Sequence, residues 1–154
     1  MNPAPQPPGT PDLAALRDAY RRDKAALLAT LVAPLPSVRS VHGVLRRLTR
    51  LADALLATLW RAAALPPGLA LVAVGGFGRR QLLPYSDVDV LVLLPSNMDP
   101  AADAALRERI ERFIGSCWDA GLDIGSSVRN ADECVAMAEQ DLTVQTALLE
   151  ARLI

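Results

Sequence analysis

Histidine is almost absent from this sequence, since His42 is the only one among 154 residues. A metal site built from several histidines is therefore excluded within the chain, and the single histidine argues against a Ser-His-Asp catalytic triad. Cys117 and Cys134 are the only cysteines, and because their spacing matches no metal motif, we predict reduced, buried thiols in a cytoplasmic protein. Aromatic residues make up only 4%, which disfavours a β-sandwich and, with the abundant Ala and Leu, favours helices.

Neither a strong charge nor a long apolar run is present. The formal net charge is -1, which argues against nonspecific binding of nucleic acid or of acidic membranes. The apolar runs fall far short of the roughly 20 residues of a membrane helix, so no membrane partner is expected. The first twelve residues have neither a basic start nor an apolar stretch, so we expect no signal peptide.

The first part of the chain is predicted to be helical. Residues 1–10 are rich in proline and are expected to be disordered, and residues 11–66 form an N-terminal helical segment. A first helix is predicted from an N-cap at Thr10 to about Val32, and Ser37 caps a second. The apolar residues of the second helix recur at helical spacing and should pack inward: Val41, Val44, Leu48, Leu51, Leu55 and Leu59.

The second part, residues 67–154, is predicted to be the core domain. Strands are expected at 69–74, 87–94 and 122–129, with a loop at 75–86 that includes a helical turn near 79–82, and with helices from Asp99 to Asp119, at 131–139 and at 142–152. This order indicates an α/β (α+β) domain with a small mixed sheet that carries helices.

A glycine pair and two aspartates give the sequence its chemistry. Gly75 and Gly76 end one predicted strand, and their bare backbone amides suit a phosphate group. Asp87 and Asp89 open the next strand, where alternation places both carboxylates on one face, roughly 6–7 Å apart. Such a pair repels unless a cation bridges it, and oxygen-only sites suit Mg²⁺ or Mn²⁺. Metal-binding carboxylates that face a phosphate-binding turn indicate chemistry on a nucleoside triphosphate.

Other polar residues extend this prediction. Arg79 could reach the triphosphate with its guanidinium, whereas the role of Arg80 stays open. Ser86 could bond a phosphate oxygen or equally close the turn before Asp87. Asp123, between two apolar residues of the third predicted strand, is the candidate third metal carboxylate, the alternative being an ordinary solvent-facing residue. Asp119 is the rival candidate, although its place at a helix end suits a cap.

At these residues the chain resembles the DNA polymerase beta-type nucleotidyltransferase superfamily. Within it, the sequence is most similar to the N-terminal domain of the PII-protein uridylyltransferase/uridylyl-removing enzyme family. Two stretches carry that resemblance: VGGFGRRQLLPYSDVDVLVLL at 74–94 and CWDAGLDIGSSVRNADECVAMAEQDLTVQTALLEARLI at 117–154. The resemblance implies a polymerase beta-like core preceded by two helices.

The resemblance also implies an activity. A tyrosine hydroxyl of PII, a nitrogen-signalling protein, would attack the α-phosphate of UTP in a metal-dependent transfer. The glycine pair matches the phosphate-holding residues, and Asp87 and Asp89 match the metal ligands. Asp123 falls where the family carries an acidic residue and would help to deprotonate the hydroxyl. Gln81 and Ser126 depart from the family, in which Glu and His are usual, so loop anchoring and the role of that His are in doubt.

The family is longer than this chain. Its members continue with a helical domain, a hydrolase domain that removes uridylyl groups, and ligand-sensing domains, so we expect a truncated core, no uridylyl-removing activity and weak or no transfer by the isolated chain. The alternatives are another protein-modifying or small-substrate nucleotidyltransferase and a catalytically silent nucleotide-binding fragment.

Overall fold

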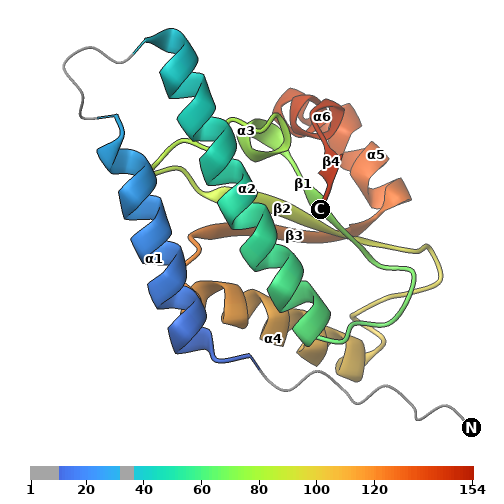
Figure 1. The fold of residues 1–154 in the computed structure, drawn as a ribbon. Coiled ribbons are helices and arrows are strands. Elements are labelled where there is room, and N and C mark those ends of the chain that lie inside the picture. Colours follow the sequence, from blue (N-terminus) through green and yellow to red (C-terminus); the bar gives the residue numbers. More distant parts are fainter. Residues whose placement is uncertain (1–10, 32–36) are drawn as a thin grey trace, which may run out of the picture.

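The computed structural model describes residues 11–31 and 37–154. Within them, six helices and four strands form one mixed α/β arrangement. Figure 1 shows α1 and α2 lying side by side across one face of the sheet with α4 below them, and α5 and α6 on the other side. The predicted mixed sheet with two preceding helices is thereby confirmed, whereas the predicted disorder of residues 1–10 lies outside the described residues.

The helices occupy six stretches. They are α1 (Leu13–Ala29), α2 (Val38–Ala62), α3 (Gly75–Gly78), α4 (Ala104–Asp119), α5 (Ala131–Gln140) and α6 (Leu142–Leu149). Ser37 caps α2 as predicted, because its hydroxyl accepts the Ser40 N–H at 3.2 Å. None of these helices, among the residues described, is long and apolar enough to cross a membrane.

The sheet has the strand order β3-β2-β1-β4. Its strands are β1 (Ala70–Ala73), β2 (Val88–Leu94), β3 (Ile124–Asn130) and β4 (Arg152–Leu153). β1 pairs antiparallel with β2 and with β4, whereas β2 and β3 are parallel. The β2–β3 register places Val88 opposite Ile124 and Asp89 opposite Gly125, so the predicted aspartates begin the central strand beside the start of its parallel neighbour.

The two faces of the sheet support separate apolar clusters. One cluster joins strand residues such as Leu71, Val90 and Val92 to α1, α2 and α4. The other joins Val72 and Leu91 to residues of α5 and α6. Alternate residues of β2 therefore enter opposite clusters, and this strand is buried on both faces of the sheet. The predicted domain division at residue 66 stays a prediction, although the first cluster includes residues from both sides of it.

Several predicted helix ends are wrong because another residue makes the cap. Asp12, not Thr10, caps α1, since its carboxylate accepts the Ala15 N–H at 3.0 Å. α4 begins at Ala104, five residues after the predicted start at Asp99, because the Asp103 carboxylate accepts the N–H groups of Ala105 and Leu106 at 3.0 Å. In each case the carboxylate caps the helix from the residue just before it.

The loop and the C-terminal end also differ from the prediction. The helical turn lies at Gly75–Gly78 and not near 79–82, because Gly75 adopts φ 57 as the chain leaves β1 and Phe77 is buried. The predicted helix over 142–152 ends at Leu149, and Arg152–Leu153 joins the sheet instead. That pairing with β1 depends on distant residues and leaves no local pattern.

Helix α2 presents a second face to the loop after α3. Thr49 is fully buried, and its hydroxyl donates to the Leu45 carbonyl at 2.9 Å while accepting the Leu82 N–H at 3.3 Å. A buried N–H needs such a partner. The loop that carries the predicted site residues is therefore anchored to α2, which the stripe of inward-facing apolar residues did not indicate.

Candidate active site

A hollow of about 390 Å³ gathers most of the predicted site residues. Its lining includes Gly76 from α3, Arg79 and Ser86 from the loop, and Asp87 and Asp89 from the start of β2. Val88 and Val90 are buried on the opposite side, as the alternation predicted. A backbone turn, a guanidinium and two carboxylates thus share one concave surface, which is a suitable place for a phosphate-bearing ligand and a cation.

Asp89 lies in a notch between two glycines. A Cβ atom at Gly125 would lie 2.5 Å from Asp89 Oδ1, and one at Gly75 would lie 3.9 Å from Oδ2. The carboxylate therefore leans across β3 in space that only glycine leaves open at position 125. Partial burial, and then the charge of Asp87, raise the pKa of the Asp89 carboxyl. Both effects disfavour the negative charge here, and a bound cation would relieve them.

Replacing Gly125 by Ala is expected to displace the Asp89 carboxylate. Because the atom in the way is the end of a side chain, Asp89 can rotate aside and the fold should tolerate the change. We expect unchanged thermal unfolding but an affinity for Mg²⁺-dependent UTP binding that is lower by about 10–100-fold, the range seen when the residues that orient metal ligands are altered. Calorimetry on the variant measures the loss. Unchanged affinity would show that the position of Asp89 does not matter.

The structure gives less support to the predicted roles of Ser86 and Asp123 than to those of the residues above. The Ser86 hydroxyl donates to the Leu83 carbonyl at 3.2 Å, which closes the turn, although the residue also lines the hollow. Asp123 is exposed directly before β3, and the pKa of Tyr20 on α1 is raised by burial and then by the charge of Asp123. Its backbone carbonyl accepts the Val88 N–H at 2.7 Å, so it stands beside the start of β2. The role of Asp123 as a ligand or base stays a prediction.

Arg79 is held by a carboxylate from the end of the chain. Its guanidinium forms an ion pair and hydrogen bond with Glu150, and Nε donates to Gln81 Oε1 at 3.3 Å. The hydrogen bond to Glu150 raises the pKa of Arg79. The guanidinium therefore stays charged beside the hollow, but any phosphate that it binds must compete with Glu150.

Replacing Glu150 by Gln is expected to tighten Mg²⁺-dependent UTP binding a few-fold. The change removes the competing charge while keeping the shape of the side chain, and exposed ion pairs of this kind contribute little to stability. The thermal unfolding midpoint should hardly move. Calorimetry tests this, and weaker binding by the variant would show that Glu150 orients Arg79 more than it competes for it.

Sequence reasoning missed the contribution of α2. His42 and Leu45 both line the hollow. They stand three residues apart, and with Thr49 they continue along one helix face toward the loop. This second line of residues could have indicated from the sequence that α2 reaches the site, but it lies beside the longer apolar stripe. The flanking Arg46, Arg47 and Arg50 are exposed.

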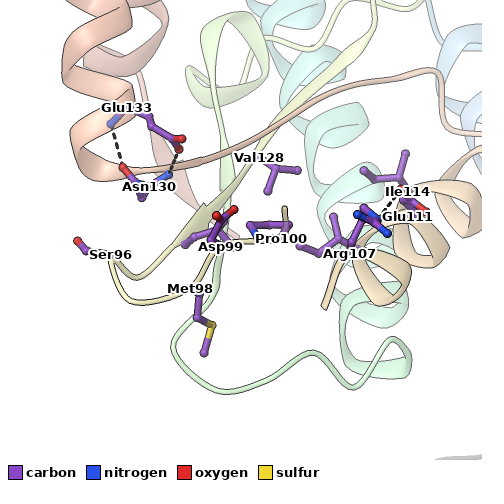
Figure 2. Close-up of a pocket in the computed structure, with 12 residues that line it drawn as sticks. Ser96, Met98, Asp99, Pro100, Arg107, Glu111, Ile114, Val128, Asn130 and Glu133 are labelled. Atoms are coloured by element: carbon purple, nitrogen blue, oxygen red, sulfur yellow. Dashed lines mark hydrogen bonds and ion pairs between the residues drawn. The ribbon is translucent and has the colours of Figure 1, made fainter. Parts of the chain in front are cut away.

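A roomier hollow, of about 600 Å³, lies at the other end of β2 near Leu94. Figure 2 shows its rim, with Asn130 and Glu133 on one side and Arg107 and Glu111 on the other. These rim groups already bond to each other, Asn130 with Glu133 in a capping box and Arg107 with Glu111 as an ion pair. The smaller hollow, which brings the glycine turn, Arg79, Asp87 and Asp89 together, is therefore the candidate active site.

The residues present fit a divalent cation that arrives with its nucleotide. Among residues 11–31 and 37–154, no group of three or more His, Cys, Asp or Glu side chains could hold a metal ion. Mg²⁺, however, is commonly bound by one or two protein carboxylates together with the phosphates of the substrate. Asp87 and Asp89 supply that number of carboxylates on the surface of the hollow.

The fold and this site together define a nucleotidyltransferase domain. The family described as "Nucleotidyltransferase domain" matches residues 57–153, which is more than half of the chain, so the chain belongs to that family. The match covers the glycine turn, both aspartates and all four strands.

The chain is also similar to particular enzymes. It is 50% identical over 143 residues to the bifunctional uridylyltransferase/uridylyl-removing enzyme of Burkholderia vietnamiensis, an alignment that covers 93% of this chain and 16% of that protein. The enzyme of the same name from Cupriavidus pinatubonensis is 51% identical over 148 residues, with 94% and 16% covered. That of Burkholderia lata is 58% identical over 113 residues, with 73% and 13% covered. The chain thus spans about one sixth of the length of these relatives.

Proposed function

We propose that this chain carries the site that transfers a uridylyl group from UTP to a tyrosine hydroxyl of the PII protein, in the cytoplasm, as part of a longer bifunctional enzyme. The observation that supports this most is the shared hollow of Gly76, Arg79, Asp87 and Asp89. The similarity to uridylyltransferases over most of the chain supports the uridylyl group as the one transferred.

The reaction exchanges a phosphoanhydride bond of UTP for a phosphodiester bond to tyrosine. The tyrosine oxygen attacks the α-phosphorus of UTP, the bond from that phosphorus to the bridging oxygen of pyrophosphate breaks, and pyrophosphate leaves with the electron pair. The tyrosine proton must pass to a base, for which Asp123 beside the start of β2 is the candidate. The products are uridylyl-PII and pyrophosphate.

The chain's own residues bind and orient the triphosphate. The amides of the Gly75–Gly76 turn would donate to phosphate oxygens, and Arg79 would neutralise negative charge there. Asp87 and Asp89 would hold Mg²⁺ or Mn²⁺. When bound, the cation would supply charge neutralisation at the phosphates and fix their orientation for in-line attack.

Labelled nucleotides test the proposal in the longer enzyme that contains this chain. UTP labelled at the α-phosphate should transfer its label to PII, whereas UTP labelled at the γ-phosphate should release all of it as pyrophosphate. Label from the γ-phosphate on PII would indicate phosphoryl transfer and contradict the proposal. A preference for another nucleotide or another acceptor would favour a different nucleotidyltransferase, and no transfer at all would favour a silent nucleotide-binding module.

A further inference from the structure

The residues after α6 pack against the glycine turn of α3, and we call this arrangement the brace. Residues 152 and 153 pair with β1, and the Ile154 N–H donates to the Leu71 carbonyl at 3.0 Å. The carbonyl of Glu150 presses against Gly78, where even a Cβ atom would not fit. This terminal segment, residues 150–154, therefore lies directly against α3.

Arg152 is the centre of this brace. Its Nη2 donates to Asp53 Oδ1 on α2 at 2.9 Å, and the two side chains are only 17% and 24% exposed. Its Nε donates to the Gly78 carbonyl at 3.3 Å, and Nη2 also lies 3.4 Å from the Phe77 carbonyl. The guanidinium carbon lies 5.5 Å from the centre of the buried Phe77 ring. One guanidinium thus joins α2, the terminal segment and the end of α3.

Helix α3 has one residue that is not glycine, Phe77, and this side chain is buried in the core. The helix has four residues, of which three are glycines, and a short glycine-rich turn has many backbone conformations available. Gly76 and Phe77 line the hollow, and Arg79 follows immediately. A shift of this turn would therefore move the phosphate-binding groups relative to Asp87 and Asp89, and displacements of about 1 Å can cost such sites much of their activity.

We propose that Arg152, anchored by Asp53, is a positioning residue of the nucleotide site, which holds the α3 turn so that Gly76 and Arg79 face the hollow. This role rests on the nucleotidyl transfer proposed above. Only arginine can serve it fully, because the planar guanidinium donates in several fixed directions at once, whereas a lysine ammonium cannot reproduce that fork.

Three variants test the proposal in the full chain. Arg152→Lys keeps the charge near Asp53 but not the fork, and Asp53→Asn with Arg152→Met removes the whole arrangement without leaving an unpaired carboxylate. Arg109→Met is the matched control, because Arg109 also donates to a backbone carbonyl, that of Ala64 at 3.1 Å, away from the hollow. Amide hydrogen exchange of residues 75–81, urea unfolding and Mg²⁺-dependent UTP binding are measured for each.

The expected result is a local loosening. In Arg152→Lys and in the double variant, the amides of Gly78, Arg79 and Gln81, which close the turn, should exchange about ten-fold faster relative to those of β2. UTP affinity should fall about ten-fold even in Arg152→Lys, whose urea midpoint should match that of Arg109→Met. Unchanged exchange of the turn, or wild-type UTP affinity in the double variant, would overturn the positioning role. If the wild-type chain itself fails to bind UTP, the proposed function fails, and the exchange rates alone decide the role of Arg152.

Discussion

Asp89→Asn is expected to reduce the proposed uridylyl transfer by at least about 100-fold while leaving the fold intact. The amide has nearly the shape of the carboxylate, so it fits the notch between Gly75 and Gly125, but it lacks the charge that binds a hard cation. Transfer of α-labelled UMP to PII measures the effect. Asp18→Asn, at an exposed position of α1, is the control and should keep full activity.

Asp89→Asn should lower the activity but raise the stability of the chain in the absence of Mg²⁺. The pKa of the Asp89 carboxyl is raised above 3.8 by partial burial and by Asp87, so folding disfavours its ionised form. That cost is present at pH above the folded-state pKa and disappears at pH well below 3.8. In urea unfolding without Mg²⁺, Asp89→Asn should therefore be slightly more stable than wild type at neutral pH, with no difference in acid.

For the activity, an Asp89→Asn enzyme that retains a tenth of the wild-type transfer rate would refute the role of Asp89 as a metal ligand.

Gly78→Ala is expected to destabilise the chain by about 1–3 kcal/mol, the usual range for overpacking in a closely packed site. The added Cβ atom would overlap the Glu150 carbonyl oxygen and would lie 3.0 Å from the Ala73 carbonyl oxygen. Both obstacles are backbone atoms, so relief requires the terminal segment to leave α3 rather than a side chain to rotate.

Gly115→Ala is the matched control for that variant. Gly115 lies inside α4, and a Cβ atom there would meet no atom within 4 Å. Since Ala is the better helix former, this change should stabilise the chain by up to about 1 kcal/mol. Urea unfolding compares the two variants. Equal stabilities would mean that the terminal segment does not press on Gly78 in solution.

The sequence predicted those parts of the site that depend on neighbouring residues. The glycine pair after a short strand, and the alternation of Asp87 and Asp89 with buried valines, both follow from local backbone geometry, and the fold confirms their placement. The cap of α2 at Ser37 was equally readable. Strand alternation was reliable over these few residues, whereas the caps of α1 and α4 and the place of the α3 turn were misplaced.

The brace around α3 could not be predicted in this way. The Arg79–Glu150 contact spans 71 residues, and the Arg152–Asp53 contact spans 99. Each of these residues, taken locally, is an ordinary charged side chain near a helix or a loop. The same holds for His42, whose place beside the hollow depends on how α2 packs against the loop.

The most direct test of the account is calorimetric titration of the chain with UTP, with and without Mg²⁺. We predict binding that requires Mg²⁺ and that is lost in Asp87→Asn and in Asp89→Asn, because these carboxylates and the triphosphate would share the cation. UTP binding that persists without Mg²⁺, or that survives in both variants, would contradict the assignment of the hollow between α2, α3 and β2 as a metal-dependent nucleotide site.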